Sequence, residues 1–240
     1  MDIFFCKNIN NSVIQLDETE SIHCIRSLRH RTGDHVAVVN GAGDYYETEI
    51  VETGKKNATL SIIRHISAYK QRPYKLHIAI APMKQIDRFE WFLEKSTEMG
   101  IDTIIPLICN RSERTHIRLD RLQQLLVTTM KQSQQAYLPE LTEPVAYKHF
   151  LNHSLKEQYT GCECFFGYCD EDIQNTLNSR YTKGNDVLIL IGPAGDFDET
   201  EIAMAFEKGV IPFSMGNNRL RTETAGMMAC SWIHVLNSPG

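Results

Sequence analysis

Two glycine-rich segments near the carboxyl end of the sequence have the composition of ligand-binding turns. Residues 192–195 (GPAG) follow a run of five apolar residues at 187–191, and residues 216–221 (GNNRLR) follow a second apolar stretch at 210–215. Glycine admits backbone angles and close approaches that other residues do not, and proline fixes a bend. Each segment therefore predicts a tight turn after a strand, at which backbone N–H and C=O groups would bind a ligand.

Two charged residues beside the second turn are candidates for chemistry. The Arg221 guanidinium can stabilise developing negative charge, and the Glu223 carboxylate can accept a proton. A carboxylate in the first turn of a helix is also favoured by the helix dipole without any catalytic role. The residues alone leave both interpretations of Glu223 open.

Helices are expected to follow both turns and to hold them in place. Asp198 and Glu201 have the spacing of a capping box, and Thr222 can cap the last helix. The buried face of the first helix is predicted to contain Ile202, Ala203 and Phe206. That of the last helix is predicted to contain Ala225, Ala229, Trp232, Ile233 and Leu236. We expect the two strand-to-helix turns to lie side by side.

The chain upstream of these turns predicts the sheet that carries them. From residue 76, a strand at 76–81, a helix at about 85–99 and a strand at 101–108 alternate, which is typical of a parallel α/β sheet. A helix at 119–135 and a strand at 162–168 follow. Ligand sites in such sheets lie at the carboxyl ends of the strands.

The amino-terminal part of the sequence predicts a small β-barrel. Short strands are expected at 3–6, 13–16, 35–39, 45–51 and 58–63. One helix interrupts them, with a capping signal at Asp17 and Glu20 and a buried stripe of Ile22, Ile25 and Leu28. Residues 64–75 read as a linker. We therefore predict two domains, at about 1–70 and 72–240.

Composition limits the classes of function. The 240 residues are 42% hydrophobic with a formal net charge of −5, which argues against indiscriminate nucleic-acid binding. No apolar run approaches the roughly 18 residues of a membrane helix, and the amino terminus lacks a signal sequence, so a cytoplasmic protein is expected.

Seven scattered cysteines do not suggest a disulfide framework. Cys162, Cys164 and Cys169 have no histidine or fourth cysteine at ligand spacing, so no metal site is expected.

The sequence lacks the motifs of common nucleotide-binding sites. No G-x-G-x-x-G follows a strand and no G-x-x-x-x-G-K-[ST] occurs, so nucleotide sites of those kinds lack support.

A basic group, formed by His23, Arg26, Arg29, His30 and Arg31, occupies the end of the amino-terminal helix. These residues are candidates for phosphate contacts, and cations at a helix carboxyl end also complement its dipole.

Three ordered segments, GPAGDF (192–197), MGNNRLRTETA (215–225) and KQIDRFEWFLEKSTEMGI (84–101), resemble the ribosomal RNA small subunit methyltransferase E family of the SPOUT superfamily. The resemblance implies an α/β SPOUT domain with a trefoil knot, preceded by a PUA-like RNA-binding β-barrel. It implies S-adenosyl-L-methionine as cofactor, methylation of N3 of one uridine in 16S rRNA, and a homodimer. The expected partner is 16S rRNA or the small ribosomal subunit.

The resemblance also assigns roles to residues of this chain. Catalysis is assigned to Arg221 and Glu223. Cofactor binding is assigned to Leu190, Gly192, Pro193, Gly195, Met215, Gly216, Leu220, Arg221, Thr224 and Ala225. RNA binding is assigned to His23, Arg26, Arg29, Arg31, Lys84, Arg88, Arg111 and Gln132.

This chain departs from the family pattern at three positions near the turn. The family turn usually reads Gly-Pro-Glu-Gly-Gly-Phe, whereas Ala194 and Asp196 stand here, and Asn110 replaces the acid of a Glu-Arg-Ser segment. Because the turn is expected to act through its backbone, cofactor binding should survive. Two rival functions remain open at this point. They are a non-catalytic RNA-binding protein on the same scaffold and a SPOUT methyltransferase acting on another RNA site.

Overall fold

The computed structural model describes residues 1–9, 12–168, 173 and 175–238, which form two compact units. The first unit comprises Met1–Gln71 and Val127–Leu138, and the second comprises Arg72–Leu126 and Pro139–Gly240. Residues 127–138 thus belong with the amino-terminal strands, although the sequence analysis placed them in the second domain. Lys131 forms an ion pair with Glu20, and the Gly43 N–H donates to the carbonyl of Ala136 at 2.9 Å. Cys169, weighed above as a metal ligand, lies outside the described residues.

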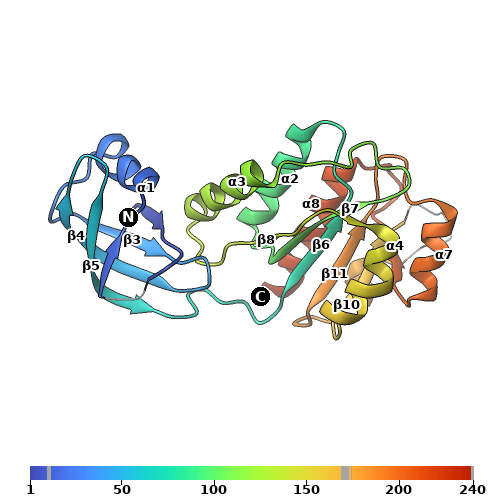
Figure 1. The fold of residues 1–240 in the computed structure, drawn as a ribbon. Helices are drawn as coiled ribbons and strands as arrows, with labels where there is room; N and C mark the ends of the chain where they lie inside the picture. Colours follow the sequence, from blue (N-terminus) through green and yellow to red (C-terminus); the bar gives the residue numbers. More distant parts are fainter. Residues whose placement is uncertain (10–11, 169–172, 174, 239–240) are drawn as a thin grey trace. The chain divides into compact units, whose positions relative to one another are not determined.

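The first unit is built on a five-stranded sheet with the order β1-β3-β4-β5-β2 (Figure 1). Neighbouring strands are antiparallel, except that β1 runs parallel to β3. Its core consists mainly of alternate strand residues, including Phe4, Ile14, Val36, Val38 and Leu60. The strands are β1 (Ile3–Phe5), β2 (Val13–Gln15), β3 (His35–Val39), β4 (Tyr45–Thr53) and β5 (Ala58–Ile66).

The helical segment of the first unit differs from its predicted packing. α1 (Glu18–Ile22) is capped by Asp17, which accepts from the Glu20 N–H at 2.8 Å, and a π-helical turn, η1 (His23–Ser27), follows. A π-turn adds a residue to the helical repeat, so a stripe spaced for 3.6 residues per turn rotates off the core. Leu28, predicted to be buried, is accordingly 39% exposed, whereas Cys24 is buried.

The second unit contains a parallel sheet with the order β12-β10-β11-β6-β7-β8, and β9 pairs with β7 as well. The strands are β6 (Leu76–Ile80), β7 (Thr103–Ile108), β8 (Glu140–Leu141), β9 (Val145–Ala146), β10 (Glu163–Gly167), β11 (Val187–Ile191) and β12 (Ile211–Phe213). The predicted strand at 162–168 proves to be β10, which lies between β11 and β12. The two strand-to-helix turns therefore follow β11 and β12, which are not neighbours in the sheet, and yet residues of both turns line one pocket, as expected for turns that lie side by side.

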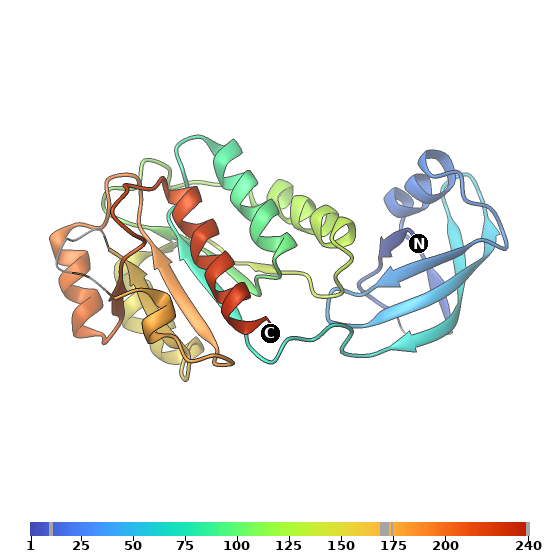
Figure 2. The same ribbon diagram turned by 180° about the vertical axis from the view of Figure 1, so that it is seen from behind.

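Helices cover both faces of this sheet. α2 and α8 pack together on one face, and the segment from α4 to α5 lies on the other (Figures 1 and 2). After β12 at the edge, the chain returns to pack α8 against β11 and β6, and the resemblance places its knot at this return. The helices are α2 (Ile86–Glu98), α3 (Leu119–Gln132), α4 (Tyr147–His149), η2 (Phe150–Ser154), α5 (Leu155–Gln158), α6 (Leu177–Arg180), α7 (Glu199–Glu207) and α8 (Thr222–Asn237).

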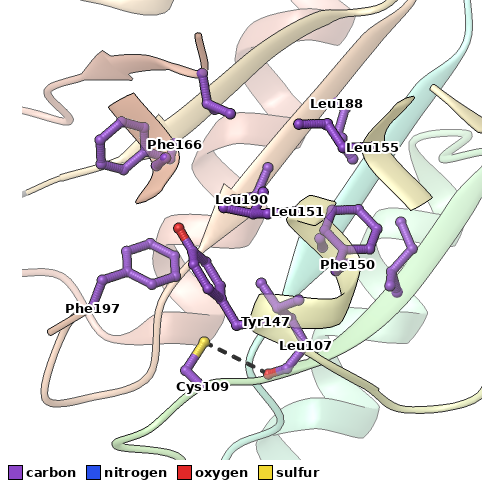
Figure 3. Packing of buried hydrophobic residues seen from close by; sticks show 14 of the residues in the cluster. Leu107, Cys109, Tyr147, Phe150, Leu151, Leu155, Phe166, Leu188, Leu190 and Phe197 are labelled. Carbon is purple, nitrogen blue, oxygen red and sulfur yellow. Dashed lines mark hydrogen bonds between the residues drawn. The ribbon is translucent and has the colours of Figure 1, made fainter. Parts of the chain in front are cut away.

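The uninterrupted apolar run of β11 packs on both faces of the sheet. Leu188 and Leu190 point into the cluster that includes Tyr147 and Phe150 (Figure 3). Successive side chains of a strand face opposite sides of the sheet, so Ile191 faces the α8 side together with its register partner Ile80. Burial on both faces explains why this strand has no polar residue.

The edge helix α7 was predicted only in part. Asp198 and Glu201 form the expected capping box. Ala203 and Phe206, predicted to be buried, are exposed, and Phe206 is 49% exposed. The buried residues of α7 are Glu201 and Ala205, because the Glu201 carboxylate points inward to accept the Asn110 N–H at 2.8 Å.

Gly226 is the point of closest approach between α8 and the sheet, and it supports a stability prediction. A Cβ at Gly226 would lie 2.7 Å from Ile80 Cδ1 and 2.8 Å from Phe92 Cε2. Overpacking typically destabilises by about 1–3 kcal/mol, and the roughly 1 kcal/mol gained in helix propensity offsets only part of it. We expect Gly226→Ala to lower the free energy of unfolding by on the order of 1 kcal/mol in urea denaturation. Thr224→Ala, at an exposed position of the same helix, should stay within about 0.5 kcal/mol of wild type, and equal stability of both variants would contradict the packing argument.

Candidate functional site

A pocket of about 1010 Å³ lies at the carboxyl ends of β10, β11 and β12. Six of the residues predicted to bind the cofactor line it, namely Gly192, Pro193, Met215, Gly216, Leu220 and Ala225. The other four lie outside the lining. Leu190 is buried in the core, and Gly195, Arg221 and Thr224 are adjacent in sequence to lining residues. The structure thus brings both glycine-rich turns to one pocket.

Gly167, at the end of β10, explains how two turns that follow non-adjacent strands meet. A Cβ at this position would lie 3.2 Å from Met215 Cε and 3.4 Å from Ile191 Cδ1. Glycine therefore leaves space for side chains from both neighbouring strand ends. Gly167 and the lining residues Tyr168, Ile173 and Thr176 were not among the predicted site residues. The glycine at the end of the predicted strand 162–168 was the available signal.

The carbonyl oxygens of the turn at 192–197 are engaged by the protein itself. The Thr222 hydroxyl donates to the carbonyl of Gly192 at 3.2 Å, and Asp196 N–H donates to that of Pro193 at 2.9 Å. The Arg219 guanidinium donates to the carbonyl of Ala194 at 3.1 Å. The Arg111 guanidinium donates to the carbonyls of Gly195 at 2.6 Å and Phe197 at 3.3 Å. These bonds fix the turn before any ligand binds.

Two positions of this region differ in role from the sequence prediction. Arg221, not Thr222, is the N-cap residue of α8, and its side chain makes no capping hydrogen bond. Thr222 is the first helical residue, and its hydroxyl is used to hold Gly192. The predicted cap was therefore displaced by one residue because the hydroxyl joins the two turns instead.

The loop after β7 is tied to the start of α7. Asn110 Nδ2 donates to Asp198 Oδ2 at 2.6 Å. Hydrogen bonds from Thr200 and Asn110 lower the pKa of Asp198 to about 2. A carboxylate at position 110, as the family usually has, would face Asp198 and repel it. The amide at this position therefore suits the aspartate of this chain.

Glu223 lies beside α2 rather than in the pocket lining. Its Oε1 is 3.5 Å from Arg88 Nη1, and the residue is only 8% exposed. Its sequence neighbour Thr222 lines the pocket, so Glu223 lies next to the two glycine-rich turns. Lys84, the other basic residue predicted on this segment, pairs with Glu113 at 3.1 Å.

Four of the five members of the basic group of the first unit are exposed. His23, Arg26, Arg29 and Arg31 are exposed, whereas His30 lies between Asp2 at 2.8 Å and Asp34 at 3.2 Å. Arg29 has a φ of 62°, so it ends the helical segment in the left-handed conformation. Gln132 is exposed at the last residue of α3, in the part of that helix that belongs to the first unit.

Family models match both parts of the chain. A model described as an RNA methyltransferase domain matches residues 70–234, and one described as an RNA methyltransferase PUA domain matches residues 16–63. The chain belongs to this RNA methyltransferase family. The predicted fold class, a SPOUT α/β domain preceded by a PUA-like barrel, is confirmed for this methyltransferase.

Individual relatives agree with the family match. This methyltransferase is 26% identical over 235 residues to a protein of Rickettsia conorii named ribosomal RNA small subunit methyltransferase E, covering 95% of this chain and 92% of the relative. A probable rRNA-methyltransferase from Porphyromonas gingivalis is 34% identical, with a TM-score of 0.89 over 99% of this chain and 98% of that one. A ribosomal RNA small subunit methyltransferase E from Neisseria gonorrhoeae, solved bound to S-adenosyl methionine, has the same fold. It is 22% identical, with a TM-score of 0.88 over 99% of this chain and 98% of that one.

Within the described part of this methyltransferase, none of the helices combines the length and the apolar character needed to cross a membrane.

Proposed function

We propose that this protein transfers a methyl group from S-adenosyl-L-methionine to N3 of one uridine in 16S rRNA. The observation that carries the proposal is the pocket bounded by the turns at 192–196 and 214–220. Membership of the RNA methyltransferase family and the names of the relatives support the substrate class. A ribosomal substrate is consistent with the predicted place of action in the cytoplasm.

The pocket fits the proposed cofactor in size and chemistry. Its volume of about 1010 Å³ is at the upper end of the roughly 300–1,000 Å³ typical of small-molecule sites. Apolar side chains of Ile191, Met215 and Leu220 would cover the adenine, and backbone groups of both turns would bind its polar edge. The bound cofactor supplies an electrophilic methyl group on a sulfonium. The protein's part is to hold the acceptor base in line with it, which is a matter of positioning.

We assign the remaining chemistry to two residues beside the pocket. The exposed Arg221 guanidinium would stabilise negative charge on the uracil oxygens, and the Glu223 carboxylate would accept the N3 proton directly or through water. The exposed cations His23, Arg26, Arg29 and Arg31 would contact RNA phosphates. With a net charge of −5, the salt dependence of RNA binding should be modest.

We further propose that two copies of the chain associate. Trp91 of α2 and Val235 of α8 are large exposed apolar side chains on helices that pack together. A second copy of this chain would cover them, as the family resemblance implies. Light scattering after size exclusion tests this association, and a mass of one chain at micromolar concentration would contradict it.

Methyl transfer from labelled S-adenosyl-L-methionine tests the proposed activity. Purified protein is incubated with naked 16S rRNA or with small subunits from cells that lack the gene, and the modified nucleotide is mapped by mass spectrometry. Label on N3 of a single uridine in 16S rRNA is the expected result. RNA binding without transfer would favour the non-catalytic rival, and label in another RNA would favour the SPOUT enzyme of different specificity.

Gly216 supports a prediction about cofactor affinity. It lines the pocket with a φ of 96°, a conformation that a β-branched residue adopts only with strain. Gly216→Val should therefore shift the second turn and weaken S-adenosyl-L-methionine binding by about tenfold or more, because a 1.4 kcal/mol loss corresponds to a factor of ten. Isothermal titration calorimetry measures the change.

A second glycine provides the matched control for strain. Gly209 also has a positive φ, of 75°, with open space around it, and it lies outside the pocket at the end of α7. Gly209→Val should destabilise the fold by a similar amount without changing cofactor affinity. Equal affinity loss in both variants would show that Gly216 acts only through general stability.

A further inference from the structure

The Arg111 side chain, assigned above to RNA from the resemblance, contacts the cofactor turn in the structure. One guanidinium nitrogen, Nη1, donates to the carbonyls of Gly195 at 2.6 Å and Phe197 at 3.3 Å. We propose that Arg111 is a positioning residue that sets the geometry of the turn at 192–197 for cofactor binding, and that it is not an RNA contact. The inference rests on the proposed function, because it concerns the same pocket.

The residue between the two bound carbonyls explains why the turn needs this support. Asp196 has a φ of 63°, the left-handed region that favours glycine, and the family usually has glycine there. Aspartate is one of the few other residues that adopt this conformation, and its Oδ1 accepts the Phe197 N–H at 2.8 Å. Arg111 holds the carbonyls on both sides of Asp196, so it stabilises the conformation that this substitution makes less favourable.

The close packing of Arg111 on the turn is a separate observation. A Cβ at Gly195 would lie 3.3 Å from Arg111 Cδ and 3.7 Å from its Cβ, so the arginine stem lies against the glycine backbone. A side chain at this position would press on the arginine stem. Gly195 is outside the pocket lining although it belongs to the turn.

The backbone that carries Arg111 is itself fixed to α7. The Asn110 N–H donates to Glu201 Oε1 at 2.8 Å, and the Ser112 hydroxyl accepts the Cys109 N–H at 2.9 Å. Glu201 also accepts the Asp198 N–H at 2.9 Å, so one buried carboxylate joins the arginine loop to the residue after the turn. Turning Nη1 of this guanidinium towards a phosphate would break its bonds to the carbonyls of Gly195 and Phe197.

Arg111→Ala separates the two roles in one pair of measurements. We expect the Kd and KM for S-adenosyl-L-methionine to rise about tenfold, since a hydrogen bond from a charged donor is among the stronger ones in proteins. The affinity for 16S rRNA, measured by filter binding, should stay within about twofold, as should kcat at saturating cofactor. Arg111→Lys, which can still donate to one carbonyl, should recover part of the cofactor affinity.

Arg118 in the same loop is the matched control, because it is exposed and lies outside the pocket lining. Arg118→Ala should leave cofactor affinity unchanged. If Arg111→Ala instead weakens RNA binding about tenfold and leaves cofactor affinity unchanged, Arg111 is an RNA contact and the inference fails. If wild-type protein binds no S-adenosyl-L-methionine, the proposed function itself fails, which is a distinct result.

Discussion

Glu223→Gln is expected to lower kcat for uridine methylation by about 100-fold and to leave the Kd for S-adenosyl-L-methionine unchanged. A positioned general base typically contributes about 10²–10⁴-fold, and glutamine cannot accept the proton. The amide oxygen keeps a hydrogen-bond acceptor for Arg88, which lies 3.5 Å from Glu223 Oε1, so the start of α8 should remain folded. Single-turnover methylation at saturating cofactor measures the effect.

The pH dependence distinguishes the base from a merely structural carboxylate. Without Glu223 the N3 proton must leave to hydroxide, so the residual rate of Glu223→Gln should rise steadily with pH. Arg88→Gln removes the ion-pair partner of Glu223 while leaving the carboxylate in place, so it tests the ion pair separately from the base. Full turnover of Glu223→Gln at every pH at which the protein is stable would show that the carboxylate only supports the helix terminus.

The local features of the site could be predicted because they depend on neighbours in sequence. The apolar run of β11, the capping box at Asp198 and the two glycine-rich turns follow from short-range patterns. Six predicted cofactor residues consequently line the pocket. The resemblance added the identity of the ligand and the order of the domains, which residue patterns do not contain.

What could not be predicted depends on long-range pairing. β10 enters the sheet between β11 and β12, and no local signal states which strands are neighbours. The role of Gly167 follows from that placement, since its missing side chain matters only between Ile191 and Met215. Residues 127–138 joined the first unit for the same reason, through the pairing of Lys131 with Glu20 across 111 positions of sequence.

Side-chain partners were the least predictable feature. Arginines were assigned to RNA by their charge, but Arg111 donates to the backbone of a turn more than 80 residues away. Arg114 is similar, since it donates to the carbonyls of Met83 and Lys84. The charge of an arginine predicts that it can bind a phosphate. The fold decides whether its guanidinium donates to a backbone carbonyl instead. Arg26 and Arg29 are exposed, and their contact with RNA stays a prediction.

Phe197→Ala is expected to lower the free energy of unfolding of the second unit by about 3–5 kcal/mol, the usual loss for a fully buried phenylalanine. Phe197 is 2% exposed, and its ring centroid lies 5.3 Å from that of Tyr147 and 6.2 Å from that of Phe166 (Figure 3). It also ends the cofactor turn, and a Cβ at Gly192 would lie 3.2 Å from its ring. Truncation therefore removes core packing and the anchor of the turn together.

Tryptophan fluorescence in urea measures this loss in the second unit alone, because the chain's two tryptophans, Trp91 and Trp232, both belong to that unit. The midpoint should fall while the slope of the free energy with urea stays constant, since the surface exposed on unfolding hardly changes. Phe197→Leu, which retains most of the volume, should lose less than about 1.5 kcal/mol. A loss below about 1 kcal/mol for the alanine variant would mean that the turn is held by its hydrogen bonds alone. In that case Arg111→Ala should become the more destabilising change, because the carbonyls of Gly195 and Phe197 would depend on that guanidinium.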